Sequence, residues 1–301
     1  MARLNDITRF LDDTLHLEKF PADYSNNGLQ FEGTDQVRRA VFAVDACEEI
    51  FSAAIERDAD FIFVHHGLSW GSGFRRITGS NARRFTALAA NGISLYAAHL
   101  PLDAHEKLGH NILLAGMAGI RNPVPFGEYH GYHIGFQGEL EKPVTLRALA
   151  KQFHEQLPSE GEFRLLGDPA LKVRHPGIIS GGGSCPELYA EIEKLDVDCL
   201  ITGEAGHSSF HYALETGTPV LMLGHYRSET PGVFAVMDLL RKKFRIETEF
   251  LRCNGSPPEE IPDRNGIHRL PDRTLIWTGP DWKDFYPFLP SRSPPLSMQS
   301  F

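Results

Sequence analysis

Apolar residues recur along this chain in two alternating patterns. Runs of consecutive apolar, β-favouring residues predict buried strands, and apolar residues spaced three or four apart predict amphipathic helices. In the first half we expect helices over residues 4–18, 48–57, 81–91 and 111–119, and strands over 37–44, 61–64 and 93–98. Since parallel neighbours need a long crossover, usually a helix, this order predicts a largely parallel α/β sheet with helices on both faces.

Residues 121–175 are less regular, and within them we expect a strand over 133–140 and a helix over 145–157. A strand then runs from 178 into Gly181-Gly182-Gly183, and the alternation of strands and helices returns. We expect strands over 199–204, 219–223 and 246–251, and helices over 187–195, 207–216 and 230–244. Three glycines after a strand either let the backbone approach a phosphate or form a tight turn, and the lysine of a phosphate loop is missing. The chain therefore divides into two similar halves, about 1–122 and 123–253.

The pattern stops near Asn254. Residues 254–301 hold nine of the twenty prolines, together with aromatic residues that argue against simple disorder. We expect one α/β domain over 1–253, followed by a Pro-rich C-terminal extension that is draped on the body or on a neighbouring subunit.

Composition narrows the functional classes. The 301 residues carry a formal charge of −9, which argues against broad nucleic-acid binding because such binding needs excess lysine and arginine. No stretch approaches the ~20 apolar residues of a membrane span. The four cysteines lack C-x-x-C spacing, and the first twenty residues lack the apolar core of a signal peptide. These features indicate a cytoplasmic protein with reduced thiols.

Candidate chemistry begins at the end of the strand over 61–64, where His65-His66-Gly67 follows. Neighbouring side chains of a strand point to opposite faces, so we expect the backbone to turn here, at Gly67, if both imidazoles serve one site. In open α/β sheets ligands bind at the carboxyl ends of strands. A histidine pair in that place suggests a metal.

Two further strand ends carry metal-binding side chains. Asp103 follows the strand over 93–98, and His225 with Glu229 follows the strand over 219–223. Three imidazoles and two carboxylates exceed the needs of one tetrahedral zinc and suit two metals ~3.5–4 Å apart, at the strand C-terminal ends between the halves. Nitrogen and oxygen donors favour Zn, Fe, Mn or Co over Cu(I).

Each residue also has a structural alternative. His65 alone could be a core histidine, and Asp103 or Glu229 could stabilise a helix N-terminus. We expect His99 to be a hydrogen-bonding partner of the ligands, Asp45 to cap the helix over 48–57, and the remaining histidines to be structural or on the surface: His105, His110, His207 and His211.

The chain resembles the dinuclear metal-centre proteins known as GTP cyclohydrolase I type 2 homologues, in their compact bacterial form. The resemblance covers about residues 1–252 and rests on six stretches: Asp23-Tyr24…Asn27-Gly28-Leu29-Gln30, Val64-His65-His66-Gly67, Tyr96-Ala97-Ala98-His99-Leu100-Pro101-Leu102-Asp103-Ala104-His105, Ser180-Gly181-Gly182-Gly183, Ile201-Thr202-Gly203-Glu204 and Gly224-His225-Tyr226…Glu229.

This resemblance implies the same five metal ligands, His65, His66, Asp103, His225 and Glu229. It also implies a toroidal homohexamer, a trimer of dimers, whose metal pairs face the interior cavity. The chain departs from the family at two places. Arg227-Ser228 stands where relatives usually have a small residue and Thr, which suggests a cation beside the site, and the extension from Asn254 has no counterpart.

Metal-bound hydroxide is a hydrolytic nucleophile, so the first hypothesis is a metal-dependent hydrolase of a nucleotide or another nitrogen heterocycle. In GTP cyclohydrolase chemistry, hydroxide would attack C8 of guanine and release formate, with His99 as a candidate proton shuttle and Arg227 either pairing with phosphate or facing solvent. The alternative is a non-enzymatic metal-binding or scaffolding hexamer. Phosphoesterase or amidase activity would use the same nucleophile.

Overall fold

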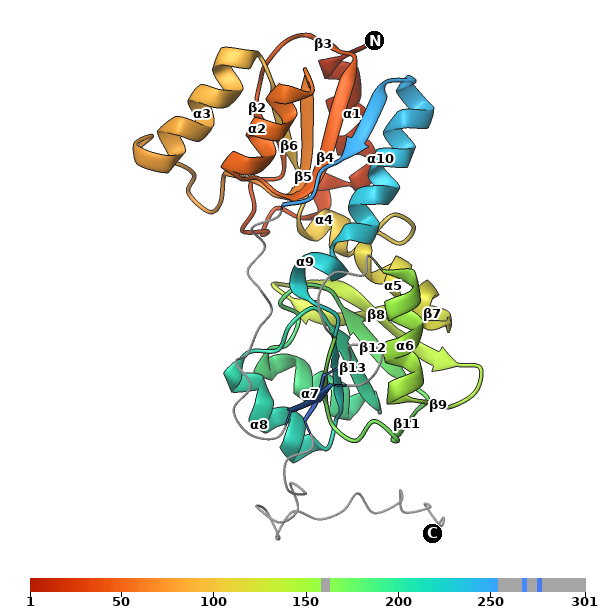
Figure 1. Cartoon of the computed structure of the whole chain (residues 1–301). Coiled ribbons are helices and arrows are strands. Elements are labelled where there is room, and N and C mark those ends of the chain that lie inside the picture. The colour runs from red at the N-terminus through yellow and green to blue at the C-terminus, as the bar shows by residue number, and fades with distance from the viewer. Residues whose placement is uncertain (158–162, 254–266, 270–274, 278–301) are drawn as a thin grey trace, which may run out of the picture.

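The computed structural model describes residues 1–157, 163–253, 267–269 and 275–277. Two β-sheets, each covered by helices, lie one above the other and meet through three helices (Figure 1). These helices are α4 (Leu100–Asp103), α5 (His110–Ala118) and α9 (His225–Ser228). The mixed α/β fold expected from the alternating pattern is confirmed.

The first sheet has five strands in the order β15-β4-β5-β6-β2. Four of them are parallel, and only the edge strand β2 runs antiparallel to its neighbour β6. The bounds are β2 (Gly28–Phe31), β4 (Arg39–Asp45), β5 (Phe61–His66), β6 (Ser94–Ala97) and β15 (Glu247–Phe250).

Alternate residues of these strands bury their side chains on opposite faces, as strand geometry requires. Phe42 and Phe63 pack with α1 (Leu4–Leu15) and α10 (Thr230–Phe244). Val41 and Ile62 pack on the other face with α2 (Glu48–Glu56) and α3 (Gly79–Asn91). When helices cover both faces of a strand, its sequence is a continuous run of apolar residues, which explains why β5 could be predicted.

The second sheet has the order β16-β17-β10-β14-β13-β12-β8-β7. Its centre, β12-β13-β14, is parallel, and β8, β7 and β10 extend it with antiparallel pairs. The bounds are β7 (Ile120–Tyr129), β8 (Tyr132–Leu140), β10 (Arg164–Leu166), β12 (Pro176–Ile179), β13 (Cys199–Thr202), β14 (Val220–Met222), β16 (Ile267–Arg269) and β17 (Leu275–Trp277).

Helices again cover both faces of this sheet. Helices α5 and α6 (Leu146–Gln156) pack on one face, and α7 (Pro186–Lys194) and α8 (His207–Thr216) pack on the other. Short elements complete the described chain: β1 (Ala2–Arg3), η1 (Leu17–Lys19), β3 (Gln36–Val37), β9 (Val144–Thr145) and β11 (Lys172–Val173).

The last helix and strand of the domain return to the first sheet. Helix α10 contacts β4, and β15 pairs with β4, although both belong to the second half of the sequence as divided near residue 122. Most of the extension over residues 254–301 lies outside the described residues, and its described part, β16 and β17, adds to the edge of the second sheet beside β10. Its draping on the body or on a neighbour stays a prediction.

Local signals bound two of the expected helices. Gly92 ends α3 in the left-handed region at φ 62°, and the Thr145 hydroxyl accepts from the N–H of Ala148 at the start of α6. One local prediction is wrong, because the residue that precedes α2 is Cys47, so Asp45 does not cap this helix. The one-turn helix α4 lies between β6 and α5 and begins with Leu100-Pro101. Pro101 fits there because the first turn of a helix uses no N–H at that position.

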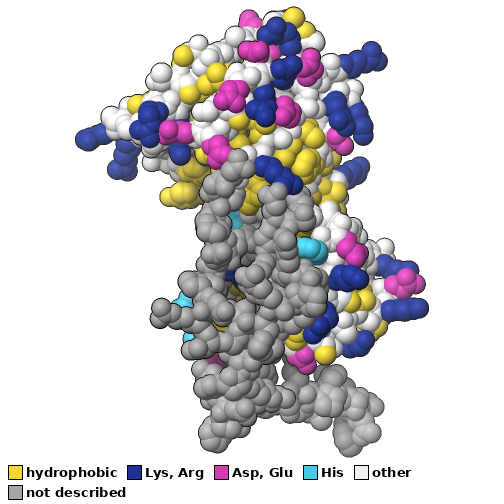
Figure 2. All heavy atoms as spheres, viewed as in Figure 1, with side chains coloured by type: hydrophobic (Ala, Val, Ile, Leu, Met, Phe, Trp, Pro, Cys, Tyr) yellow, Lys and Arg dark blue, Asp and Glu magenta, His cyan; other side chains and the backbone are white. Residues whose placement is uncertain are grey.

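Figure 2 shows Lys and Arg side chains interspersed with Asp and Glu side chains on the upper part of the molecule, which contains the first sheet and its covering helices. Among the helices that the structure describes, none combines the length and the apolar character needed to cross a bilayer.

Candidate metal centre

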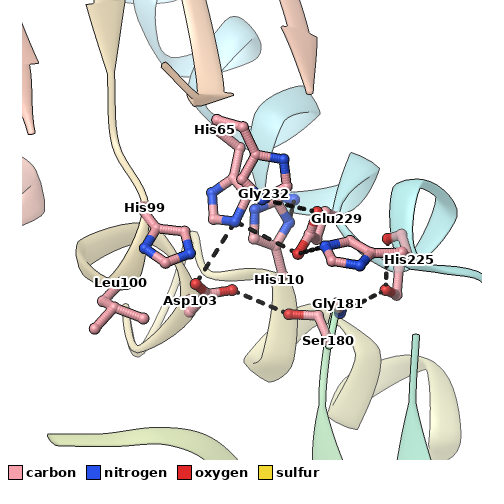
Figure 3. Close-up of polar contacts among 12 residues, drawn as sticks. His65, His99, Leu100, Asp103, His110, Ser180, Gly181, His225, Glu229 and Gly232 are labelled. Carbon is pink, nitrogen blue, oxygen red and sulfur yellow. Dashed lines mark hydrogen bonds and ion pairs between the residues drawn. The ribbon is translucent and has the colours of Figure 1, made fainter. Parts of the chain in front are cut away.

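All five predicted ligands converge where the carboxyl ends of β5 and β6 meet α9. Figure 3 shows four of them, His65, Asp103, His225 and Glu229. Glu229 lies at the middle of the group. Its Oε1 is 3.6 Å from His65 Nε2 and 3.2 Å from His225 Nε2, and its Oε2 is 3.5 Å from His66 Nε2. Asp103 Oδ2 approaches His65 Nε2 from the other side, at 3.6 Å. Segments from both halves of the chain therefore build one site.

The adjacent histidines reach this site without the expected turn. Strand β5 continues through His66, and the rings of His65 and His66 lie 4.5 Å apart at 50°. Gly67 is needed for space, because a Cβ there would lie 2.4 Å from Gln30 Oε1 and 2.6 Å from the Cβ of Ala97. The prediction that the backbone turns out of the strand here is wrong, and the missing side chain of Gly67 is the relevant feature.

Four histidines share one arrangement, in which Nδ1 is hydrogen-bonded away from the site. The partners are the Ala98 carbonyl for His65 (2.8 Å), Asp45 for His66 (2.8 Å), Asp23 for His99 (2.9 Å) and Glu204 for His225 (2.9 Å). Such bonds place a proton on Nδ1 and leave Nε2 as the nitrogen that a metal could bind. The arrangement is typical of metal-binding histidines.

His110 was expected to be structural or on the surface, yet it lies fully buried against His65, with ring centroids 4.6 Å apart. Its Nδ1 accepts from the N–H of Gly232 at 3.0 Å. A neutral ring that accepts at Nδ1 carries its proton on Nε2. His110 Nε2 therefore carries a proton, and it makes no hydrogen bond within the described residues. The ring lies close enough to His65 and Asp103 for the three residues to hold a metal, but a protonated Nε2 has no lone pair to offer, so we expect His110 not to be a ligand.

The three glycines after β12 serve the site as a tight turn. Gly181 has φ +60°, and a Cβ there would lie 2.1 Å from Glu229 Oε1. Its N–H donates to the hydroxyl of Ser228, and the neighbouring Ser180 hydroxyl donates to Asp103 Oδ1 at 3.0 Å. The turn thus supports both carboxylates, which favours the structural alternative over a phosphate loop.

Electrostatics in the site are dominated by the buried carboxylates. Burial would raise the pKa of Glu229, but the imidazoles of His65 and His66 reverse this and hold it well below its ordinary value. Burial lowers the pKa of His225, but the hydrogen bond to Glu229 raises it to about 10 on balance. Burial also raises the pKa of Asp103. In the metal-free protein, His225 therefore keeps a proton beside the Glu229 carboxylate, at the place where a bound cation would otherwise balance the charge.

Like His110 Nε2, the buried atoms His65 Nε2 and Glu229 Oε2 make no hydrogen bond within the part of the chain that the structure describes. Leaving such groups without a partner is costly unless something else binds them. Imidazole nitrogen and carboxylate oxygen are both ligands of divalent metals. The orphaned atoms and the donor set fit a metal.

Residues 2–257 match the family Duf34/NIF3 (NGG1p interacting factor 3). This chain belongs to the NIF3 family. It is 42% identical over 250 residues to a relative from Archaeoglobus fulgidus, covering 82% of this chain and 97% of the relative. A relative from Pyrococcus horikoshii is 39% identical over 251 residues, with 82% and 96% covered. Both relatives are named "GTP cyclohydrolase 1 type 2 homolog", which confirms the resemblance seen in the sequence motifs.

Solved structures agree with this membership. The protein TTHA1606 from Thermus thermophilus superposes with a TM-score of 0.73 at 36% identity, covering 84% of this chain and 98% of that one. The protein ybgI, described as of unknown function, gives a TM-score of 0.73 at 29% identity, covering 87% and 99%. The NIF3 fold is therefore shared over nearly the whole of these chains.

A cavity of about 240 Å³ opens onto the site of this NIF3-family chain. Its lining includes the candidate ligands His66, Asp103, His225 and Glu229, together with His99, and also Tyr129, Ile134, Ile179 and Leu188. Arg227 does not line the cavity. Its side chain is buried, with the guanidinium 4.7 Å from the ring centroid of Phe163. The cation expected beside the site therefore lies in the core around the second sheet instead.

Proposed function

We propose that this chain binds two divalent metal ions, Zn, Fe or Mn, and acts in the cytoplasm as a metal-dependent hydrolase. His65 and Asp103 would hold one ion, His66 and His225 the other, and Glu229 both. The observation that carries the proposal is the position of the Glu229 carboxylate, whose two oxygens lie 3.2–3.6 Å from three inward-facing imidazole nitrogens. One imidazole of the adjacent pair would then serve each ion.

A bound metal pair supplies an ionised water near neutral pH, which is the nucleophile of hydrolysis. The chain supplies the remainder of the site. His99 lines the cavity, and its ring is oriented by Asp23, which also accepts from the N–H of Leu100. His99 is thus placed to accept or donate a proton at Nε2 during a reaction in the cavity.

The apolar lining of the cavity supports a flat substrate. Tyr129, Ile134 and Leu188 line the same space of about 240 Å³ as the polar group, and this volume suits one heterocyclic ring better than an extended chain. The relatives' name points to GTP chemistry, and the proposed substrate class is therefore a nucleotide or another nitrogen heterocycle.

Metal content is the first test. Elemental analysis of protein purified without added metal should find two ions per chain, and a loss of at least one ion in His65→Ala. His211→Ala, on the exposed face of α8, is the matched control and should keep both ions. A wild-type protein that binds no divalent ion after loading with Zn, Fe and Mn would contradict the proposed site.

Turnover is the second test, because metal binding alone does not distinguish an enzyme from a metal-binding scaffold. Each metal-loaded form should hydrolyse GTP or a member of a panel of nucleotides, nucleobases, phosphoesters and amides, and His65→Ala should abolish the activity. Full metal occupancy without turnover on this panel would favour the non-enzymatic alternative.

The proposal includes self-association into a homohexamer, a trimer of dimers, supported by the family resemblance. Light scattering on the full chain should give a mass of six 33.6 kDa subunits. A monomer or dimer at micromolar concentration would contradict the assembly and leave the metal proposal to the tests above.

A further inference from the structure

Two cysteines that are 206 residues apart in sequence face each other at the edge of the first sheet. The Sγ atoms of Cys47 and Cys253 lie 3.6 Å apart, within van der Waals contact. Cys47 immediately precedes α2, and Cys253 comes three residues after β15. Both residues are partly exposed.

The fold brings these cysteines together. Strand β15 runs parallel to β4 with Phe250 opposite Phe42, and the N–H of Leu251 donates to the Phe42 carbonyl at 2.7 Å. The chain that leaves β15 therefore runs beside the end of β4, from which the backbone enters α2 (Figure 1). Cys47 and Cys253 pack against the same apolar cluster, which holds them in place.

A second contact fixes the orientation of Cys253. Its thiol donates to Glu49 Oε2 at 3.1 Å, in the first turn of α2. The sulfur of Cys253 is therefore held over the N-terminal end of α2, next to Cys47. The other two cysteines lie in and around the second sheet, where Cys185 precedes α7 and Cys199 is buried in β13.

We propose that Cys47 and Cys253 form a reversible disulfide when the protein meets a peroxide. One thiolate attacks a peroxide oxygen, giving a sulfenic acid and releasing hydroxide or the corresponding alkoxide. The second thiolate then attacks the sulfenic sulfur, the S–S bond forms, and hydroxide leaves. Two thiols are oxidised by two electrons and one peroxide is reduced, and a dithiol such as reduced thioredoxin or dithiothreitol reverses the step.

The contact distance is compatible with this reaction. A disulfide needs its sulfurs ~2.05 Å apart, so closure requires a movement of roughly 1.5 Å, which rotation of two side chains can supply. The bond would tie the end of β15 to the start of α2. Cys47 stands two residues after Asp45, whose carboxylate accepts from His66.

The test uses the full chain treated with a small excess of hydrogen peroxide. Alkylation before and after treatment should show a loss of two of the four reduced thiols, and non-reducing peptide mapping should find the Cys47 peptide joined to the Cys253 peptide, about 2 Da lighter than the two reduced peptides together because two thiol protons are lost. Dithiothreitol should restore all of the alkylatable thiols.

Three variants complete the test. Cys47→Ser and Cys253→Ser should each abolish the cross-link, while Cys185→Ser, another partly exposed cysteine that precedes a helix, should leave it intact. Retention of every reduced thiol at saturating peroxide, oxidation of Cys47 or Cys253 to sulfinic acid without a cross-link, or pairing with Cys185 or Cys199 would overturn the proposal.

Discussion

Asp45 and His66 are register partners on neighbouring parallel strands, and the Asp45 carboxylate accepts from the Nδ1–H of His66 at 2.8 Å. The pairing exists because β4 and β5 end level with each other at the same edge of the sheet. One strand therefore supplies a candidate ligand, and its neighbour supplies the group that orients this ligand. Such oriented partners raise the basicity of a metal-binding histidine.

Replacing Asp45 by Ala should weaken binding of the metal held by His66 by ~10–100-fold, because the ring would lose its fixed proton and orientation. Competition with a chromophoric chelator measures the affinity. Glu48→Ala is the matched control, since its carboxylate is near in sequence but pairs with Arg83 on the surface. An equal loss of affinity in both variants would show that general surface charge, rather than the Asp45–His66 bond, matters.

Gly181 makes room for the central carboxylate, so Gly181→Ala should displace Glu229 and reduce bound metal. The added Cβ would lie 2.1 Å from Glu229 Oε1, and alanine at φ +60° costs a further ~1–2 kcal/mol of folding free energy. Gly182→Ala provides the control, because its nearest contacts are at 3.8 Å. Elemental analysis and urea unfolding should show loss for the first variant and little change for the second. Equal metal content in both would contradict the assignment of Glu229.

Because His110 Nδ1 accepts from Gly232, its Nε2 carries the proton, and we expect His110 not to be a metal ligand. His110→Leu should keep both metals per chain but lower the free energy of unfolding by ~1–3 kcal/mol, because the buried N–H of Gly232 loses its acceptor. His110→Gln offers a replacement acceptor and should recover part of this loss. A fall in metal stoichiometry in both variants, with unfolding unaffected, would instead identify His110 as a ligand.

The ligands were predictable from the sequence for a topological reason. The carboxyl ends of parallel strands meet at one edge, so side chains at the ends of β5, β6 and β14, or in the segments that follow them, are candidates for one site even without contact information. His65, Asp103 and His225 all follow this rule. The fold class was predictable for a related reason, since strands buried on both faces carry unmistakable apolar runs.

The missed features depend on contacts that sequence distance conceals. Asp45 looks like a helix cap because it stands near α2, but its partner His66 is reached across the sheet. His110 begins α5, and its tautomer is set by Gly232, 122 residues away. Strand β7 escaped prediction because Pro123 and Pro125 interrupt it, and proline is tolerated on an edge strand, where one N–H side is unpaired.

The last prediction concerns pH and the metal-free protein. Burial lowers the pKa of His225, but Glu229 and then Glu204 raise it to about 10 on balance, against an ordinary value near 6.5. Burial, opposed by Glu229 and Asp45, leaves the pKa of His66 raised as well. Because the folded state binds these protons more tightly than the unfolded state, they stabilise the fold fully below pH 6.5.

This stabilisation should be lost as pH rises from 6.5 through about 10. Urea unfolding of chelator-treated protein at pH 6, 8 and 10 should therefore show a difference between wild type and His225→Gln that shrinks with rising pH. His211→Gln, an exposed histidine of α8 away from Glu229, corrects for the general effect of removing an imidazole. Metal affinity should change in the opposite direction and strengthen with pH, since each ion must displace the protons that Glu229 holds on the neighbouring rings. A wild-type advantage over His225→Gln that stays constant across this range would show that no shared proton links His225 to Glu229 in the metal-free site.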